Sequence, residues 1–77
     1  MPIVVTLDVM LAKRKMSLTE LSRAVGVTLG QLSLLKTEKA LAIRFTTLDR
    51  ICLTLSCQPA DLMHWVTEEE YKQLKRL

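Results

Sequence analysis

Few residues in this sequence break a helix. Only two glycines and two prolines occur in 77 residues, and neither a low-complexity linker nor an internal repeat is visible. Aromatic residues are equally scarce, since Phe45, Trp65 and Tyr71 are the only three, and the apolar residues are mainly Leu, Val, Ile, Ala and Met. This mixture favours small packed helices over an aromatic-rich β sandwich. We therefore predict one all-α domain whose short helices are joined by short loops.

Long apolar runs and a secretion signal are also missing. No run approaches the roughly 20 apolar residues that a helix needs to cross a bilayer. No cationic segment followed by an apolar segment opens the chain. We expect a cytoplasmic protein with no membrane partner, in which Cys52 and Cys57 stay reduced and serve as small hydrophobic groups.

Residues able to bind a metal or to carry out catalysis are too few to form a recognisable site. Cys52, Cys57 and His64 are the candidate soft ligands, but structural zinc generally needs four closely spaced ligands, and Asp61 is a poor fourth. His64 has no convincing carboxylate to orient it for acid–base chemistry. The sequence predicts no metal, no cofactor, no small-molecule substrate and no enzymatic activity.

The first two helices are predicted from their caps and their apolar spacing. Thr6 can cap a helix in which apolar residues recur at positions 7, 10 and 11. In "SLTE", Ser17 followed three residues later by Glu20 is typical of a capping box, so a second helix begins at about Leu18.

A tight turn separates the second helix from a third. Gly26 supplies a positive φ at no steric cost, and Thr28 is immediately available to cap a helix over about residues 29–37. Two short helices joined by such a turn cross at a steep angle, which leaves the outer face of the third helix exposed.

The rest of the chain predicts a loop over residues 38–44 and two further helices. Thr46 or Thr47 can cap a fourth helix, and Pro59 suits the first position of a short fifth helix that ends at about Met63.

The two ends of the chain are each open to two interpretations. The N-terminal "PIVV" is either a frayed end or an edge strand that pairs with its symmetry mate. Thr67 caps a C-terminal helix whose narrow apolar edge consists of Tyr71, Leu74 and Leu77. That edge either forms a dimer or docks on its own chain.

A set of residues around the tight turn is more specific than any single glycine turn. Small or apolar side chains at the required spacing fill the angle between the two helices: Leu21, Ser22, Gly26, Val27, Leu32 and Leu35. On these residues the chain resembles the Cro/phage-repressor type helix-turn-helix, also called the xenobiotic-response-element family. "IRFTTLDRICLTLSCQPADLM" looks like that family's loop, fourth helix and fifth helix, so the resemblance covers about residues 6–66.

The resemblance implies a five-helix lambda-repressor-like DNA-binding domain over residues 1–66, with the motif at about 18–37 and a C-terminal helical extension over 67–77. It also implies a sequence-specific, repressor-like transcriptional regulator that binds double-stranded DNA as a homodimer on two half-sites. In that family the second helix of the motif enters the major groove. The matching positions in the groove are Thr28, Leu29, Gly30, Gln31 and Leu34. Flanking them are Ser33 and Lys36, and the positions that usually meet phosphate or the minor groove are Thr37, Lys39 and Arg44.

Charge and side-chain chemistry support part of this assignment. Between positions 13 and 50 the chain has eight basic residues and three acidic ones, within a net charge of +3. Lys36, Lys39 and Arg44 lie within nine residues, and each can neutralise a phosphate and release counterions. Gln31 has the amide geometry for bidentate recognition of adenine, and Leu29 can contact a thymine methyl group.

Some positions depart from the family pattern. Leu18 replaces a common glutamine, Glu38 replaces a usual glycine, and an acidic side chain there would be repelled by phosphate if it faced DNA. Leu29 and Leu34 replace polar base-reading residues. The alternative function is therefore a helical protein-interaction adaptor or dimerisation module that has lost base-specific DNA binding. Two apolar residues outside the inward-facing stripe favour such a contact surface, namely Leu41 and Leu53.

Overall fold

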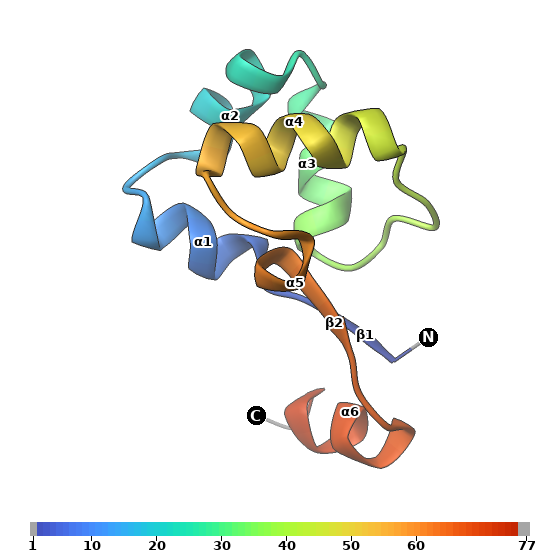
Figure 1. Ribbon diagram of the computed structural model, residues 1–77. Helices are drawn as coiled ribbons and strands as arrows, with labels where there is room; N and C mark the ends of the chain where they lie inside the picture. Colours follow the sequence, from blue (N-terminus) through green and yellow to red (C-terminus); the bar gives the residue numbers. More distant parts are fainter. Residues whose placement is uncertain (1, 76–77) are drawn as a thin grey trace.

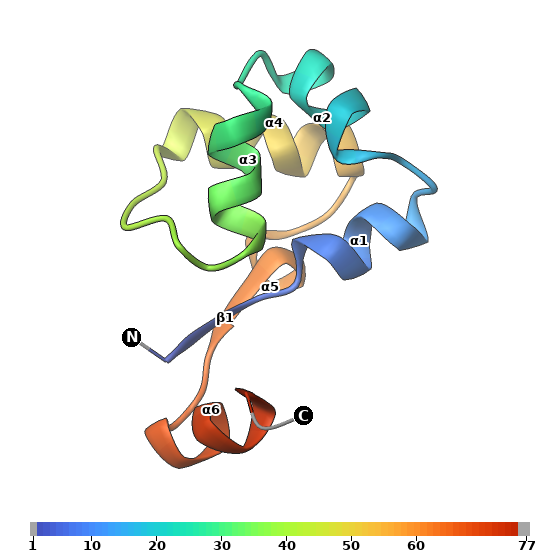
Figure 2. The same cartoon turned by 180° about the vertical axis from the view of Figure 1, so that it is seen from behind.

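The computed structural model describes residues 2–75, which form a helical bundle with a short strand pair and a helix extending from one side (Figures 1 and 2). In chain order the elements are β1 (Ile3–Val5), α1 (Leu7–Lys13), α2 (Leu18–Val25), α3 (Leu29–Lys36), α4 (Phe45–Leu55), α5 (Pro59–Leu62), β2 (Met63–Trp65) and α6 (Glu68–Lys75). The predicted helical class is confirmed, and the two-stranded sheet is a small addition to it. The third and fifth helices each end one residue earlier than expected.

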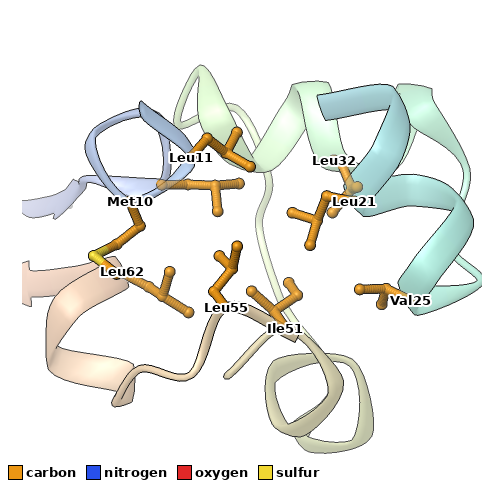
Figure 3. Packing of buried hydrophobic residues seen from close by; sticks show 9 residues of the cluster. Met10, Leu11, Leu21, Val25, Leu32, Ile51, Leu55 and Leu62 are labelled. Carbon is orange, nitrogen blue, oxygen red and sulfur yellow. The ribbon is translucent and has the colours of Figure 1, made fainter. Parts of the chain in front are cut away.

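The core lies where the five helices of the bundle converge (Figure 3). Ile51 on α4 and Leu21 on α2 are completely buried, and no polar or charged residue among those described is buried with them. Burying a side chain of this size contributes roughly 2–3 kcal/mol relative to leaving it in water. The apolar spacing of the sequence therefore determines how α1–α5 pack. The buried cluster consists of Leu7, Met10, Leu11, Leu21, Val25, Leu32, Ile51, Leu55 and Leu62.

The turn between α2 and α3 has the predicted geometry. Gly26 has φ 78°, and its N–H donates to the Ser22 carbonyl at 2.9 Å, which closes α2. Thr28 then caps α3 by accepting a hydrogen bond from the Gln31 N–H at 3.2 Å. The Ser22 hydroxyl donates to the Val27 carbonyl and fixes the turn against α2. Both the glycine stop and the threonine cap are confirmed.

The predicted caps of α1 and α4 are wrong in their side-chain detail. Thr6 occupies the cap position of α1, but its hydroxyl donates to the Asp61 carbonyl at 2.8 Å instead of capping the helix. α4 begins at Phe45, before Thr46 and Thr47, because the extended Arg44 already accepts the first helical hydrogen bond through its carbonyl. No side chain caps α4.

The N-terminal segment is an ordered strand. One of its edges is occupied by β2 of the same chain, so that edge cannot pair with a symmetry mate. β1 pairs antiparallel with β2 in the same chain, with Val4 opposite His64. A hydrogen bond from the Thr6 N–H to the Leu62 carbonyl, 2.7 Å long, extends this pairing. β2 was not predicted, because the fifth helix was expected to end at about Met63, whose backbone is in fact extended at φ −159° and ψ 150°.

α6 has the predicted cap but hardly any apolar attachment. The Thr67 hydroxyl oxygen accepts a hydrogen bond from the Glu70 N–H at 3.1 Å. None of the residues of α6 is buried, although Tyr71 is half-buried. Leu77, which was expected to complete the apolar edge of this helix, lies outside the described residues.

Candidate nucleic-acid interface

α3 presents one open face to solvent and buries the other. Its inward face carries Leu32, which is 1% exposed, and Leu35, which packs against the core from a half-buried position. All ten residues predicted to contact DNA are exposed. They are Thr28, Leu29, Gly30, Gln31, Ser33, Leu34, Lys36, Thr37, Lys39 and Arg44. The face of α3 that the helix-turn-helix resemblance assigns to the groove is therefore free of other parts of the described chain.

The first turn of α3 combines a helix cap with a recognition side chain. The Gln31 side-chain oxygen accepts a hydrogen bond from the Thr28 N–H at 3.4 Å, a long and therefore weak contact. The amide NH₂ group of Gln31 is an additional donor on the exposed face. A Cβ atom added to Gly30 would meet no atom within 4 Å, so the backbone there is open to a close approach by a ligand. This turn can offer hydrogen-bonding groups and a flat backbone surface to base edges.

Two apolar side chains interrupt the polar face. Leu29 is 46% exposed and Leu34 is 49% exposed. Apolar groups in a DNA groove contact thymine methyl groups, whereas in a protein interface they pack against another apolar surface. The exposure of these two leucines fits both of the functions considered for the chain.

The basic residues that follow α3 share a continuous surface with the base-reading candidates. Lys39 and Arg44 line a groove together with Gln31 and Leu34 of α3. Lys36 lies in the last turn of the helix and is exposed. The structure thus brings two predicted phosphate-binding residues, Lys39 and Arg44, together with Gln31 and Leu34 in one groove.

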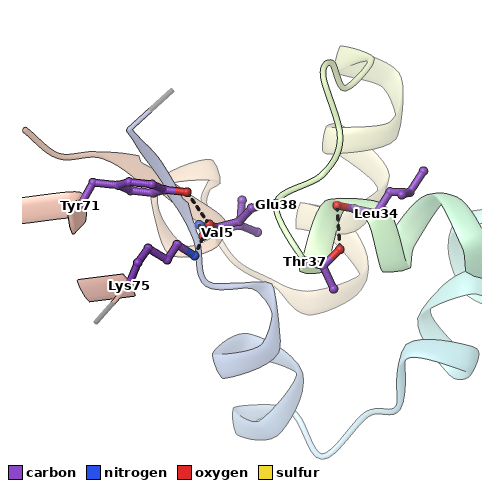
Figure 4. Close-up of polar contacts among 6 residues, drawn as sticks. All are labelled: Val5, Leu34, Thr37, Glu38, Tyr71 and Lys75. Atoms are coloured by element: carbon purple, nitrogen blue, oxygen red, sulfur yellow. Dashed lines mark hydrogen bonds and ion pairs between the residues drawn. The ribbon is translucent and has the colours of Figure 1, made fainter. Parts of the chain in front are cut away.

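Thr37 and Ser33 are linked to each other at the end of α3. The Thr37 hydroxyl donates to the Ser33 carbonyl at 2.8 Å. It also makes a longer contact with the Leu34 carbonyl, at 3.4 Å, which Figure 4 draws. The threonine oxygen retains its capacity to accept a hydrogen bond, but its proton is directed at the helix.

Glu38 makes a helix end that usually calls for glycine. Its φ is 63°, its N–H donates to the Leu35 carbonyl at 3.1 Å, and the Lys39 N–H donates to the Leu34 carbonyl at 2.8 Å. This pair of hydrogen bonds is the Schellman motif, in which a residue with positive φ follows the helix. The backbone requirement that the family meets with glycine is met here by a glutamate.

The Glu38 carboxylate is occupied by partners from β1 and α6 (Figure 4). One oxygen accepts the Val5 N–H at 2.9 Å, and the other accepts the Tyr71 hydroxyl at 3.1 Å and pairs with the Lys75 ammonium. The side chain is only 11% exposed. Burial alone would raise its pKa, but the hydrogen bonds from Lys75, Val5 and Tyr71 outweigh that effect, so the pKa lies below the usual value for glutamate. No local pattern of residues indicates these contacts.

The remaining residues singled out in the sequence lie outside this surface or in the core. Leu18 is half-buried and packs against the core, which explains an apolar residue at that position. His64 is exposed on β2. Cys52 and Cys57 are free and half-buried, and burial followed by the neighbouring Cys52 raises the pKa of the Cys57 thiol.

The described part of the chain holds neither a metal-binding cluster nor a helix that could cross a membrane. Within residues 2–75, no three His, Cys, Asp or Glu side chains gather closely enough to hold a metal ion. In that range no helix has both the length and the apolar character that crossing a membrane requires.

Comparisons with known proteins agree with the geometry of α2 and α3. Residues 6–68 match the Cro/C1-type HTH DNA-binding domain. The chain is also 51% identical over 76 residues to YozG of Bacillus subtilis (strain 168), described as an uncharacterized HTH-type transcriptional regulator. This alignment covers 99% of the present chain and 90% of YozG.

Proposed function

The chain belongs to the Cro/C1-type helix-turn-helix DNA-binding family, and we propose that this DNA-binding transcriptional regulator acts as a repressor by occupying an operator in the cytoplasm. The observation that carries the proposal is the open outer face of α3, which is continuous with the basic side chains of Lys39 and Arg44. A helix of this size fits the major groove, where each base pair presents a distinct set of donors and acceptors. Occupancy of the operator is the whole mechanism, and it needs no chemistry by the protein.

Base reading and phosphate binding are assigned to different parts of the surface. The groove contacts are made by Thr28, Leu29, Gln31 and Leu34, while Gly30 lets the backbone approach closely, and Gln31 is the residue best suited to a bidentate contact with adenine. Lys36, Lys39 and Arg44 neutralise phosphates, Thr37 meets phosphate or the minor groove, and Ser33 flanks the groove contacts. Exposure of all these residues supports the assignment.

Titration of duplex DNA tests the assignment. Lys36→Ala and Arg44→Ala should each lower affinity for every duplex and reduce the slope of log affinity against log salt by about one. Gln31→Ala should instead change the preference among sequences. Lys13→Ala is the matched control, since it removes an exposed charge from the end of α1 that lies away from α3 (Figures 1 and 2). Equal binding by the wild type and a Lys36→Ala/Arg44→Ala double variant would refute the assignment.

The operator contact requires two copies of the domain in this proposal. Two recognition helices about one DNA turn apart imply a two-fold homodimer. β1 and α6 already make contacts within their own chain, whereas α4 exposes Phe45 and Leu53 to 87% and 78%. Large apolar side chains this exposed are typical of a surface that packs against a partner. We assign the dimer contact to this face of α4.

Sedimentation of α4 variants tests the dimer. Phe45→Lys and Leu53→Lys should convert the protein to monomers without unfolding it. Val9→Lys is the control, because Val9 is a half-exposed apolar residue on α1, outside the proposed contact. A wild-type protein that sediments as a monomer both with and without duplex DNA would eliminate the homodimer.

The second candidate function is that of a protein-interaction adaptor, which the half-exposed Leu29 and Leu34 favour. An adaptor without DNA binding shows no steep loss of duplex affinity between low and moderate salt, whereas phosphate neutralisation requires one. Selection of bound duplexes from a random pool then separates weak from specific binding. Enrichment of two-fold symmetric sequences supports the operator, and its absence supports the adaptor.

A further inference from the structure

We propose that Glu38 is a positioning residue for DNA binding, because its carboxylate ties the segment that follows the recognition helix to β1 and α6. The proposal rests on the proposed function, in which Lys39 and Arg44 of that segment contact phosphates. It assigns a task to an acidic side chain that would otherwise be expected to weaken binding to a polyanion.

The backbone of Glu38 determines how the chain leaves α3. With φ at 63°, Glu38 turns the chain so that both the Lys39 and the Ala40 N–H groups donate to the Leu34 carbonyl, at 2.8 and 3.1 Å. A non-glycine residue occupies this left-handed region only at a cost in energy. A glycine would make the same turn more easily, but it would have no side chain to hold the turn in place.

The side chain of Glu38 supplies that hold through three donors on two other elements. The Val5 N–H belongs to β1, whereas the Tyr71 hydroxyl and the Lys75 ammonium belong to α6 (Figure 4). Each of these donors is more than 30 residues away in sequence, so the contacts hold the end of α3 against segments near both ends of the chain. Because the side chain is 11% exposed, solvent screens these contacts less than it screens a surface pair.

α6 depends on the same contacts. It buries no residue, and within residues 2–75 the two side-chain hydrogen bonds that join α6 to a distant segment both end on Glu38. The C-terminal helix therefore acts as a brace for the end of the recognition helix. Lys39 follows Glu38 directly, so any movement of Glu38 also moves the Lys39 side chain, which binds a phosphate in the proposed function.

Glu38→Gln distinguishes positioning from simple charge repulsion because the two effects have opposite signs. The amide oxygen can still accept the Val5 N–H, but the NH₂ group cannot accept hydrogen bonds from Tyr71 or Lys75. Removing the negative charge raises the net charge above +3, which by itself strengthens binding to DNA. The positioning role predicts weaker binding instead, by about fivefold, which corresponds to roughly 1 kcal/mol.

Two variants on α6 test the same contacts from the other side. Tyr71→Phe removes one hydroxyl without changing the charge and breaks one of the three hydrogen bonds to Glu38, so it should weaken duplex binding less than Glu38→Gln does, by about twofold to threefold. Lys75→Gln should weaken binding more than Lys72→Gln, which removes the same charge from an exposed position on the same helix. Binding is measured by fluorescence anisotropy with a mixed-sequence duplex at low ionic strength.

Amide hydrogen exchange provides a readout that does not involve DNA. Glu38→Gln and Tyr71→Phe should accelerate exchange at the Lys39 and Ala40 N–H groups, while the Leu32 N–H inside α3 keeps its wild-type rate. Failure of the wild type to bind any duplex would overturn the proposed function and leave this exchange result to be judged separately. Unchanged exchange, or unchanged or tighter duplex binding by folded Glu38→Gln, would overturn the positioning role.

Discussion

The helices of the bundle are held to one another by different forces from those that hold the C-terminal helix α6 to the bundle. α1–α5 all contribute to one cluster of buried apolar side chains, and α6 contributes none. α6 is instead joined through the hydrogen bonds of Tyr71 and Lys75 to a single carboxylate, that of Glu38. Burial of apolar area is non-directional and spread over many residues, whereas a polar attachment depends on the geometry of a few atoms. The two regions should therefore respond differently to the same kind of change.

Truncation of the core gives the largest expected effect. Ile51→Ala removes a completely buried side chain from the centre of the bundle and should lower the free energy of unfolding by about 2–5 kcal/mol. Thr46→Ala, at an exposed position of the same helix, should change it by less than about 0.5 kcal/mol. Urea denaturation followed by circular dichroism measures both. Similar losses in the two variants would mean that α4 does not face the core as described.

The two glycines near α3 have different requirements, because Gly26 in the turn before the helix has a positive φ and Gly30 inside the helix does not. At Gly26, φ is 78°, and the nearest atom to an added Cβ would be in the Arg50 guanidinium at 3.9 Å. A side chain therefore has enough space there, and a substitution is opposed only by the strained backbone conformation. Gly26→Ala should therefore cost about 1–2 kcal/mol. Gly30→Ala, inside α3 with open space around it, should be neutral or stabilising by up to about 1 kcal/mol. Thermal melts of the two variants that shift in the same direction would contradict this description of the turn.

Acid should loosen α6 before it affects the bundle. The native pKa of Glu38 is lowered, so its contribution to stability is fully present above the unfolded pKa of about 4.3 and is lost as the pH falls through the native value. The hydrogen bond to Glu38 raises the pKa of the Lys75 ammonium, so this partner stays protonated over the range. The Val5 amide resonance should follow this titration, and Glu38→Gln should abolish it. A midpoint at or above the ordinary glutamate value would show that the carboxylate gains nothing from its partners.

The same contrast explains what the sequence could predict. Signals for the bundle are local: Ser17 and Glu20 are three residues apart, and Gly26 and Thr28 bracket one turn. Apolar spacing then indicates which face of each helix is buried. For that reason the helices, the turn and the exposed face of α3 follow from the sequence, together with the resemblance to the helix-turn-helix family.

Contacts between distant segments gave no comparable signal. Val5 and Tyr71 are each 33 residues from Glu38, and nothing in the sequence pairs them. β2 is only three residues long, too short for an alternating pattern to separate it from the end of α5. Nothing in the sequence indicates that Phe45 is exposed, because large aromatic side chains are usually buried. These are the features on which the polar attachment and the proposed dimer surface depend.

The same helix cap in the two regions provides the smallest and most direct test of the comparison. Thr28 caps α3, whose Leu32 belongs to the core, and Thr67 caps α6, which buries nothing. Thr28→Ala should lower the global free energy of unfolding by about 1 kcal/mol. Thr67→Ala removes the equivalent capping hydrogen bond and also the bond from the Thr67 hydroxyl to the Glu70 carboxylate. It should nevertheless leave the midpoint of global unfolding unchanged and accelerate only the amide exchange of α6, because that helix opens locally. If Thr67→Ala shifts the global midpoint as far as Thr28→Ala does, α6 unfolds together with the bundle, and the few hydrogen bonds to Glu38 couple the two regions as strongly as a shared core.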